Sequence, residues 1–229
     1  MLIGILQTGH APDQMRPILG DYNTMFEELL SGKGFTFQTW NVAEMDFPNS
    51  VAAADGWLIT GSRHGVYEDH PFIPPLEQFI QSAFVANVPV VGICFGHQIM
   101  AQAMGGKVEK STKGWGVGRQ AYLYGDEEIT MNAWHQDQVI EKPALATTIA
   151  SNGFCAHAGL LYGQRGFSVQ AHPEYGDQVI QGLINLRGVG VVPDNRLAYA
   201  QSQMGQPNSS ARIAQDIAEF FHLPREAAQ

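Results

Sequence analysis

One cysteine in this sequence has the neighbours that a reactive thiol requires. Cys94 lies in Gly92-Ile93-Cys94-Phe95-Gly96, where an apolar run meets a helical pattern. Glycines on both sides leave room for a sharp strand-to-helix turn, which places a side chain at the start of a helix. The unpaired N–H groups there stabilise a thiolate over a thiol. The pattern predicts a nucleophile at position 94, whereas a cysteine buried for packing alone is the alternative.

The second chemical motif is His172-Pro173-Glu174. Residues two apart on an extended segment point to the same side, and the proline fixes φ between them, so an imidazole and a carboxylate can be held together. A thiol nucleophile needs such a base, and the base needs a group that orients it. Taken alone, the triplet is also typical of a surface turn. A metal site made of Cys94, His172 and Glu174 is a further alternative, because all three are zinc-ligand types.

The elements that must position these residues alternate along the chain. Apolar runs and period-two patterns predict strands at 2–7, 35–40, 57–60, 88–93 and 167–171. Apolar stripes predict helices at 22–30, after an Asp21 cap, and at 76–86, 95–104, 177–187 and 209–221. Such alternation predicts a mostly parallel sheet with helices on both faces. Cys94 and His172 then lie at the carboxyl ends of strands, where ligands bind in such sheets.

The middle of the chain has a different pattern. Between residues 107 and 162, short β-like segments are expected at 117–123 and 128–131, joined by Gly125-Asp126, and at 133–139, 147–150, 154–157 and 160–162. They predict a small antiparallel extension of the parallel core. The stretch 188–208, rich in Gly, Pro, Asn and Gln, is the nearest thing to a linker. We expect one domain over residues 1–229.

Composition restricts the class of partner. A net charge of −9 argues against a nucleic-acid or anionic-membrane surface. Cys94 and Cys155 are the two cysteines, in unlike contexts, which favours a reducing compartment over a disulfide framework. Residues 1–6 are apolar without a basic region and too few for a signal or a membrane span, so we expect a cytoplasmic protein. The oligomeric state cannot be predicted from these features.

A second loop follows the strand expected at 57–60. It has the sequence Thr60-Gly61-Ser62-Arg63-His64-Gly65. If this strand neighbours the one before Cys94, backbone N–H groups of Gly61 or Ser62 and of Phe95 can converge on a developing oxyanion. A plain turn explains the glycines equally well. Arg63, His64 and His70 are expected to be solvated loop residues rather than ligands, with a role at the rim in substrate selection as the alternative.

These motifs together resemble a known family. Gly92-Ile93-Cys94-Phe95-Gly96-His97-Gln98 is followed by Gly105-Gly106-Lys107-Val108 and then by Ala171-His172-Pro173-Glu174. The set resembles the class I glutamine amidotransferases, in the style of the glutaminase domain of GMP synthase, over nearly the whole chain. The resemblance implies a flavodoxin-like α/β fold.

The resemblance also implies roles for the matching residues. Cys94 would be the nucleophile, His172 the base and Glu174 the group that orients it. Backbone N–H groups of Gly61 and Phe95 would form the oxyanion hole. Substrate contacts would come from Gln98 and from the segment Trp134, His135 and Gln136. Thr60-Gly61-Ser62-Arg63 stands where Gly-Gly-Pro is more usual, and Gln136 where Gly is frequent, which affects the expected shape of the substrate and not the triad.

The implied activity is hydrolysis of the side-chain amide of glutamine through a γ-glutamyl thioester, with no cofactor and no metal. In amidotransferases the ammonia passes to a synthetase, yet this chain has no glycine-rich nucleotide-binding fingerprint. Either a separate synthetase subunit receives the ammonia, or the protein acts alone. The alternatives are a γ-glutamyl hydrolase or peptidase and a non-catalytic glutamine-binding regulatory subunit.

Overall fold

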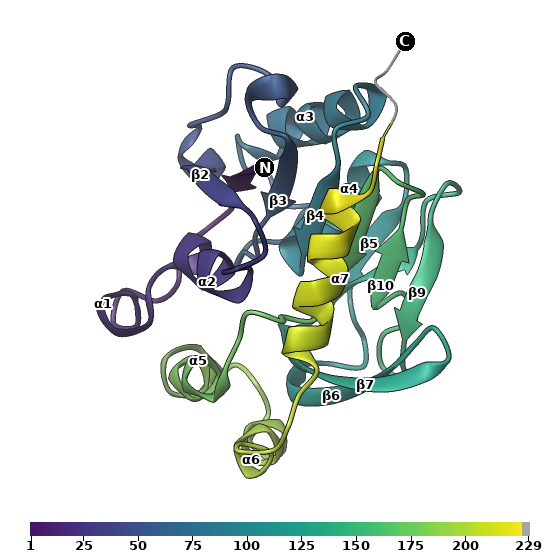
Figure 1. The fold of residues 1–229 in the computed structure, drawn as a ribbon. Coiled ribbons are helices and arrows are strands. Elements are labelled where there is room, and N and C mark those ends of the chain that lie inside the picture. Colours follow the sequence, from purple (N-terminus) through teal and green to yellow (C-terminus); the bar gives the residue numbers. More distant parts are fainter. Residues whose placement is uncertain (226–229) are drawn as a thin grey trace.

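The computed structural model describes residues 1–225, which are organised around one nine-stranded sheet (Figure 1). Its strands lie in the order β2 (Thr36–Trp40), β1 (Leu2–Leu6), β3 (Gly56–Ile59), β4 (Val90–Ile93), β11 (Gly166–Val169), β10 (Gly159–Leu161), β9 (Thr147–Ser151), β6 (Gly116–Tyr124) and β7 (Glu127–His135). The first five are mutually parallel and the rest pair antiparallel. The predicted parallel core is confirmed.

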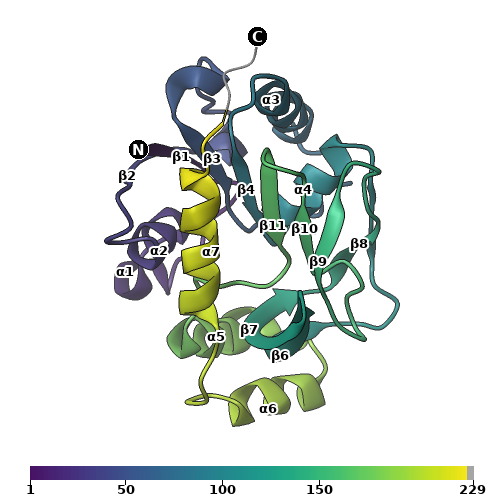
Figure 2. The same cartoon turned by 45° about the vertical axis from the view of Figure 1, so that its right-hand side comes forward.

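Helices cover both faces of the parallel strands (Figure 2). α3 (Ile73–Val85) and α4 (Phe95–Ala103) pack on one face, and α2 (Tyr22–Leu29) and α7 (Ser210–His222) on the other. α7 packs there because its apolar residues recur every three or four positions, at Ile213, Ile217 and Phe221 among others. Within residues 1–225, no helix combines the length and the apolar character that a bilayer crossing needs.

The antiparallel part of the sheet is larger than the sequence suggests. β6 and β7 form a long hairpin that turns at Gly125 and Asp126, as predicted, with Gly125 at φ 58°. A separate two-stranded sheet pairs β5 (Lys107–Lys110) with β8 (Asp137–Glu141). The strand expected at 154–157 is wrong. The Asn152 side chain accepts hydrogen bonds from the N–H groups of Phe154 and Cys155, at 2.9 and 2.7 Å, and so holds a turn there.

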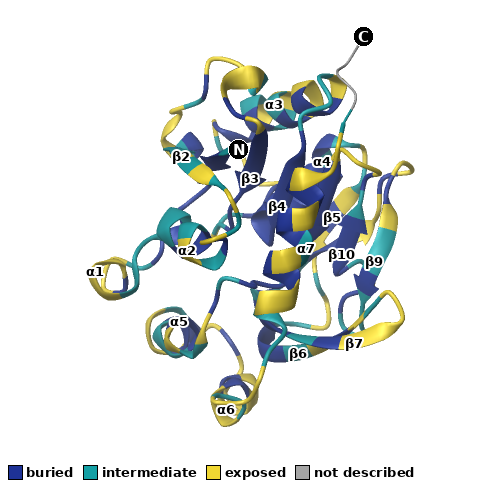
Figure 3. Ribbon diagram, in the orientation of Figure 1, coloured by how far each residue is buried: buried dark blue, intermediate teal, exposed yellow. Residues whose placement is uncertain are grey.

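The stretch 188–208 is not a linker along its whole length. It contains α6 (Asp194–Ser202), which packs so closely on β6 that a Cβ on Gly118 would lie 2.5 Å from Ala200 Cβ. The helix expected at 177–187 is α5 (Asp177–Leu183) followed by one π-helical turn (Ile184–Gly188). Three shorter helical turns, α1 (Arg16–Leu19), η1 (Val42–Glu44) and η2 (Val51–Ala53), complete the set. Figure 3 shows that the burial lies in the central strands and in the inward helix faces.

The turn between β4 and α4 depends on two glycines. A Cβ on Gly92 would lie 2.4 Å from the carbonyl oxygen of Gly96, and a Cβ on Gly96 would lie 2.3 Å from that of Ile59. Both distances are shorter than real Cβ contacts, and both neighbours are backbone atoms that cannot rotate away. Glycine at these positions therefore lets α4 start directly against β3 and β4.

We expect Gly96→Ala to lower the free energy of unfolding by about 1–3 kcal/mol, the usual cost of forcing an extra methyl into a packed site. Denaturant unfolding followed by circular dichroism measures the change. Gly153→Ala is the matched control, because its Cβ would meet nothing within 4 Å and its φ is not in the left-handed region. Equal unfolding midpoints for the two variants would contradict the steric account.

Candidate active site

Cys94 occupies the junction of β4 and α4 in a strained backbone conformation, at φ 54° and ψ −99°. A positive φ is uncommon for any residue with a Cβ, and it persists only where the surroundings impose it. Here the Cys94 N–H donates to Val169 O at 2.9 Å. The residue is 6% exposed and caps the N-terminal end of α4. The helix thus presents its positive end to the thiol.

His172 and Glu174 follow β11, the strand next to β4. The carboxylate oxygen Oε1 of Glu174 lies 2.6 Å from His172 Nδ1, and both side chains are almost fully buried. The backbone N–H of His172 donates to Asn132 O at 2.8 Å. The ring of Tyr175 stacks on the imidazole with centroids 3.9 Å apart and planes within 2°. The imidazole is therefore fixed on two sides.

The charge on His172 depends on its two neighbours. Burial alone lowers the pKa of His172, because it disfavours the cation. The negative charge of Glu174, that of Cys94 when ionised, and hydrogen bonds to both side chains outweigh burial and raise this pKa well above its ordinary value. Since Nδ1 faces Glu174, Nε2 is the atom left to bond with the sulfur. The arrangement favours the protonated form of His172.

Two backbone N–H groups near the sulfur are without a partner. In the part of the chain that the structure describes, residues 1–225, neither Gly61 N–H nor Phe95 N–H makes a hydrogen bond. A Cβ on Gly61 would lie 2.9 Å from His172 Cε1 and 3.7 Å from Cys94 Cβ, so this backbone lies directly against both. β3 and β4 are neighbours, as this geometry requires. The two N–H groups are suited to bind an oxygen that becomes negatively charged.

A cavity of about 320 Å³ opens above Cys94 and His172. Four residues expected to contact the substrate line it, namely Gln98, Trp134, His135 and Gln136. Gln98 Nε2 donates to Asp137 O at 2.8 Å and to Gln170 Oε1 at 3.1 Å, so this side chain is held by the protein itself. Glu174 is not part of the lining, and it reaches the cavity only through His172.

Sequence reasoning missed several residues that line the cavity or lie behind it. Gln170 Nε2 lies 3.6 Å from Cys94 Sγ, and its position two before His172 was the available signal. Asp137 accepts a hydrogen bond from the Tyr67 hydroxyl at 3.0 Å, and burial raises the pKa of this carboxyl. Ser62, Arg63 and His64, for which the sequence offered an oxyanion or rim role as an alternative, also line the cavity. The other lining residues were not predicted, and they are Tyr22, Gly65, Glu68, Lys110, Trp115, Tyr175, Leu183, Arg187 and Val191.

The metal alternative for the triad has no geometric support. Among residues 1–225, the ligand atoms of Cys94, His172 and Glu174 do not form a group that could hold one ion. One such group exists in this part of the chain, and it lies on the loop after β3, at His64, Glu68 and His70.

Glu174→Gln is expected to lower kcat by about 10²–10⁴-fold, by analogy with loss of the orienting carboxylate in other triads. The amide keeps the shape but removes the charge that favours imidazolium. If Oε1 is kept against His172, the new NH₂ group stands at the position of Oε2, which has no hydrogen-bond partner in the described structure. Steady-state kinetics measure the loss. Asp177→Asn, outside the cavity, is the control. An unchanged rate in Glu174→Gln would show that the carboxylate does not orient His172.

Two buried histidines predict sensitivity to acid. Burial lowers the pKa of His97 to about 3 and that of His135 to about 4. Because both rings protonate more readily when unfolded, stability is present above pH 6.5 and is lost as the pH falls toward 4, by up to about 1.4 kcal/mol per pH unit for each ring. His172, whose pKa is raised, contributes stability that increases as the pH falls to 6.5 and is complete below that pH, so it adds nothing to the loss in acid. Chemical denaturation at pH 7, 6 and 5 measures the slope, and a flat profile would contradict this.

Comparisons with known proteins identify similar sequences and structures. The family model described as glutamine amidotransferase class-I matches residues 25–181. A putative glutamine amidotransferase-like protein of Schizosaccharomyces pombe is 26% identical over 246 residues, which cover 96% of this chain and 98% of that protein. Gamma-glutamyl peptidase 3 of Arabidopsis thaliana is 30% identical over 72% of this chain and 74% of its own length.

Two further likenesses are more limited. The glutamine-hydrolysing GMP synthase of Vibrio campbellii is 28% identical over 89% of this chain, but the match spans only 41% of that enzyme. The crystal structure of a glutamine amidotransferase from Thermotoga maritima superposes with a TM-score of 0.76 over 97% of this chain and 98% of that one. At 18% identity, this second likeness concerns the fold.

Proposed function

Since this chain belongs to the class I glutamine amidotransferase family, we propose that it is a cysteine hydrolase of the γ-glutamyl amide bond, with glutamine as substrate. One observation carries the proposal. Cys94, in its strained turn, and His172 line one cavity, and Glu174 contacts His172 from outside it. A nucleophile, a base and an orienting carboxylate in this arrangement are what acyl transfer requires.

In the first half of the reaction, the Cys94 thiolate attacks the amide carbon of the substrate side chain. The N–H groups of Gly61 and Phe95 stabilise the oxyanion. His172 gives its proton to the leaving nitrogen, so ammonia departs and a γ-glutamyl thioester remains. In the second half, His172 takes a proton from water, the hydroxide attacks the thioester, and glutamate leaves as the thiolate re-forms.

Glu174 has the positioning role. Its contact with Nδ1 at 2.6 Å leaves Nε2 toward the sulfur and stabilises the imidazolium that waits to protonate the leaving group. Gln98, Trp134, His135 and Gln136 line the cavity where the α-amino and α-carboxylate groups of the substrate would bind. Asp137 and Arg187 add an acidic and a basic side chain to the lining of the same cavity.

A γ-glutamyl peptidase activity is the second candidate. The cavity has aromatic walls at Trp115 and Trp134 and basic side chains at Arg63 and Lys110, beyond what an ammonia leaving group needs. The Arabidopsis gamma-glutamyl peptidases also match this chain over most of their own length, whereas the GMP synthase does so over less than half. If ammonia is transferred rather than released, the acceptor chemistry belongs to a separate synthetase subunit.

A substrate panel distinguishes these functions. Purified protein is supplied with glutamine, γ-glutamyl dipeptides and γ-glutamylated amines, and released ammonia, amine and glutamate are measured. Glutamine hydrolysis supports the first candidate, and cleavage of dipeptides alone supports the second. If none of the substrates is hydrolysed, the result would favour a non-catalytic glutamine-binding role and would contradict the proposal.

A cytoplasmic location is part of the same proposal. Both cysteines are free and buried, and a reactive thiol at Cys94 needs a reducing compartment to stay reduced. Fluorescent tagging and microscopy test the location.

A further inference from the structure

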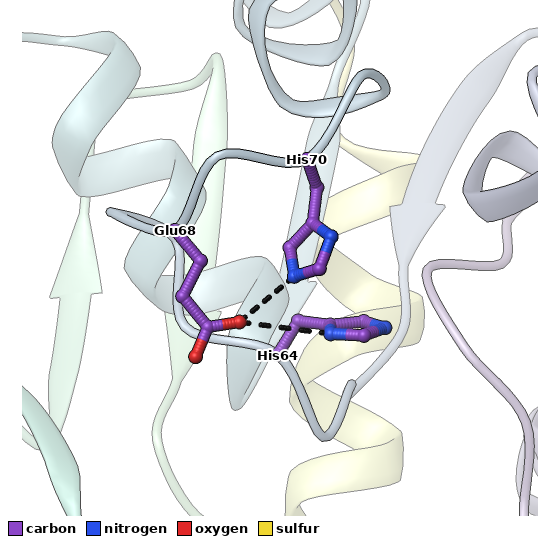
Figure 4. Close-up of side chains that lie close together, drawn as sticks. All are labelled: His64, Glu68 and His70. Atoms are coloured by element: carbon purple, nitrogen blue, oxygen red, sulfur yellow. Dashed lines mark hydrogen bonds and ion pairs between the residues drawn. The ribbon is translucent and has the colours of Figure 1, made fainter.

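Beside the cavity, the loop after β3 brings three metal-ligand side chains together. Figure 4 shows His64 and His70 on the same side of Glu68, with one carboxylate oxygen facing both rings. Glu68 Oε2 lies 2.8 Å from His70 Nε2 and 3.6 Å from His64 Nδ1. All three ligand atoms lie within 4.8 Å of one another. The sequence favours solvated loop residues at positions 64 and 70, and nothing in the spacing of this triplet predicts that the side chains converge.

The separations suit a small metal ion. In tetrahedral zinc sites with ligand bonds of about 2.0–2.1 Å, neighbouring ligand atoms lie roughly 3.3 Å apart. The two contacts that Glu68 makes lie on either side of that value. Two histidines and one glutamate are also a known zinc ligand set, and three protein ligands leave a fourth position for water or a bound compound.

The loop holds these side chains in place without a metal. Val66 and Phe72 are buried within it, at 1% and 3% exposure, and Gln102 Nε2 donates to Val66 O at 2.7 Å. At the start of the loop, the Ser62 hydroxyl donates to Thr8 O and accepts from His64 N–H. The site is therefore largely preorganised, which lowers the entropy cost of binding an ion.

The surrounding charge is mixed. Glu68 and the nearby Asp137 carboxylate favour a cation, whereas Arg63 opposes one. The side chains of His64, Glu68 and His70 are 23%, 47% and 29% exposed, so an ion can enter from solvent.

We propose that His64, Glu68 and His70 form a binding site for a divalent transition-metal ion of the zinc type at the rim of the cavity. Because His64 and Glu68 also line the cavity, an ion there ties the loop together next to the substrate entrance. Binding of the ion does not depend on hydrolysis, so the metal site and the proposed activity can fail separately.

The test uses untagged full-length protein and Zn²⁺ alone, measured by isothermal titration calorimetry. The background is Cys94→Ala, since a thiolate could bind zinc by itself. We expect one equivalent of Zn²⁺ to bind. The affinity should fall at least about 10-fold in His64→Ala, His70→Ala and Glu68→Gln, because loss of a residue that only hydrogen-bonds a metal ligand already costs about that much. His157→Ala, a half-buried histidine on the β9–β10 connection, is the matched control and should bind as the background does.

Two further measurements test whether the loop side chains are the metal ligands. Co²⁺ in place of Zn²⁺ should give visible d–d absorption that disappears in His70→Ala, and Zn²⁺ should raise the melting temperature of the background but not of His70→Ala. Circular dichroism checks that each variant is folded. Absence of binding in the Cys94→Ala background, or binding that survives all three loop substitutions, would overturn the site.

Discussion

The Cys94→Ala protein is expected to hydrolyse glutamine, or whichever γ-glutamyl amide the panel identifies, about 10⁴–10⁶-fold more slowly than the unchanged protein. Without the sulfur no thioester forms, and the oxyanion groups and the binding residues supply the only remaining acceleration. Alanine removes only the buried Sγ atom from the core cluster that contains Cys94, so the variant is expected to stay folded. Glutamate release in a coupled assay measures the rate.

Cys155→Ala is the matched control for this loss. Cys155 is fully buried, and burial raises the pKa of its thiol to about 12, so it is neither exposed nor ionised. Its substitution should leave kcat unchanged. A Cys94→Ala protein that keeps more than a tenth of the original rate would remove Cys94 from the mechanism.

His172→Ala is expected to cost about as much as loss of the nucleophile, because a triad works as a unit. Without the imidazole, nothing protonates the leaving nitrogen or activates water, and Glu174 remains as a buried carboxylate without its partner. The double variant with Cys94→Ala should be no slower than either single variant. Kinetics of all three proteins test this coupling.

Two controls separate chemistry from folding in His172→Ala. The truncation leaves space beside Tyr175, whose ring stacks on the imidazole, so added imidazole should restore part of the rate. His172→Gln fills more of the space and should remain inactive while folded, as judged by circular dichroism. Full activity in a folded His172→Gln protein would show that another group is the base.

The parallel core was predictable because its signals are local. Each strand and helix has its own apolar pattern, and Gly92 and Gly96 indicate the turn at Cys94 without reference to distant residues. The antiparallel half was predicted only in outline. At 154–157, β-like residues form a turn because the Asn152 side chain competes for their backbone N–H groups.

The candidate site was predictable to the same extent. His172 and Glu174 share one triplet, whereas the Asn132 carbonyl that anchors His172 and the Tyr175 ring that stacks on it depend on how the antiparallel strands reach the parallel ones. In the sequence, His64, Glu68 and His70 are only three polar residues of one loop. Their side chains converge because Val66 and Phe72 of the same loop are buried, which the sequence does not indicate. The roles assigned to the triad stay predictions until they are measured.

The most direct measurement is covalent labelling. The protein is treated with a diazoketone analogue of glutamine, and the adduct is located by peptide mass spectrometry. We predict one adduct, on Cys94, that glutamine or the preferred γ-glutamyl substrate prevents and that Cys94→Ala abolishes. Labelling at Cys155, labelling that substrate does not slow, or no labelling of an active protein would contradict a nucleophilic thiol at position 94.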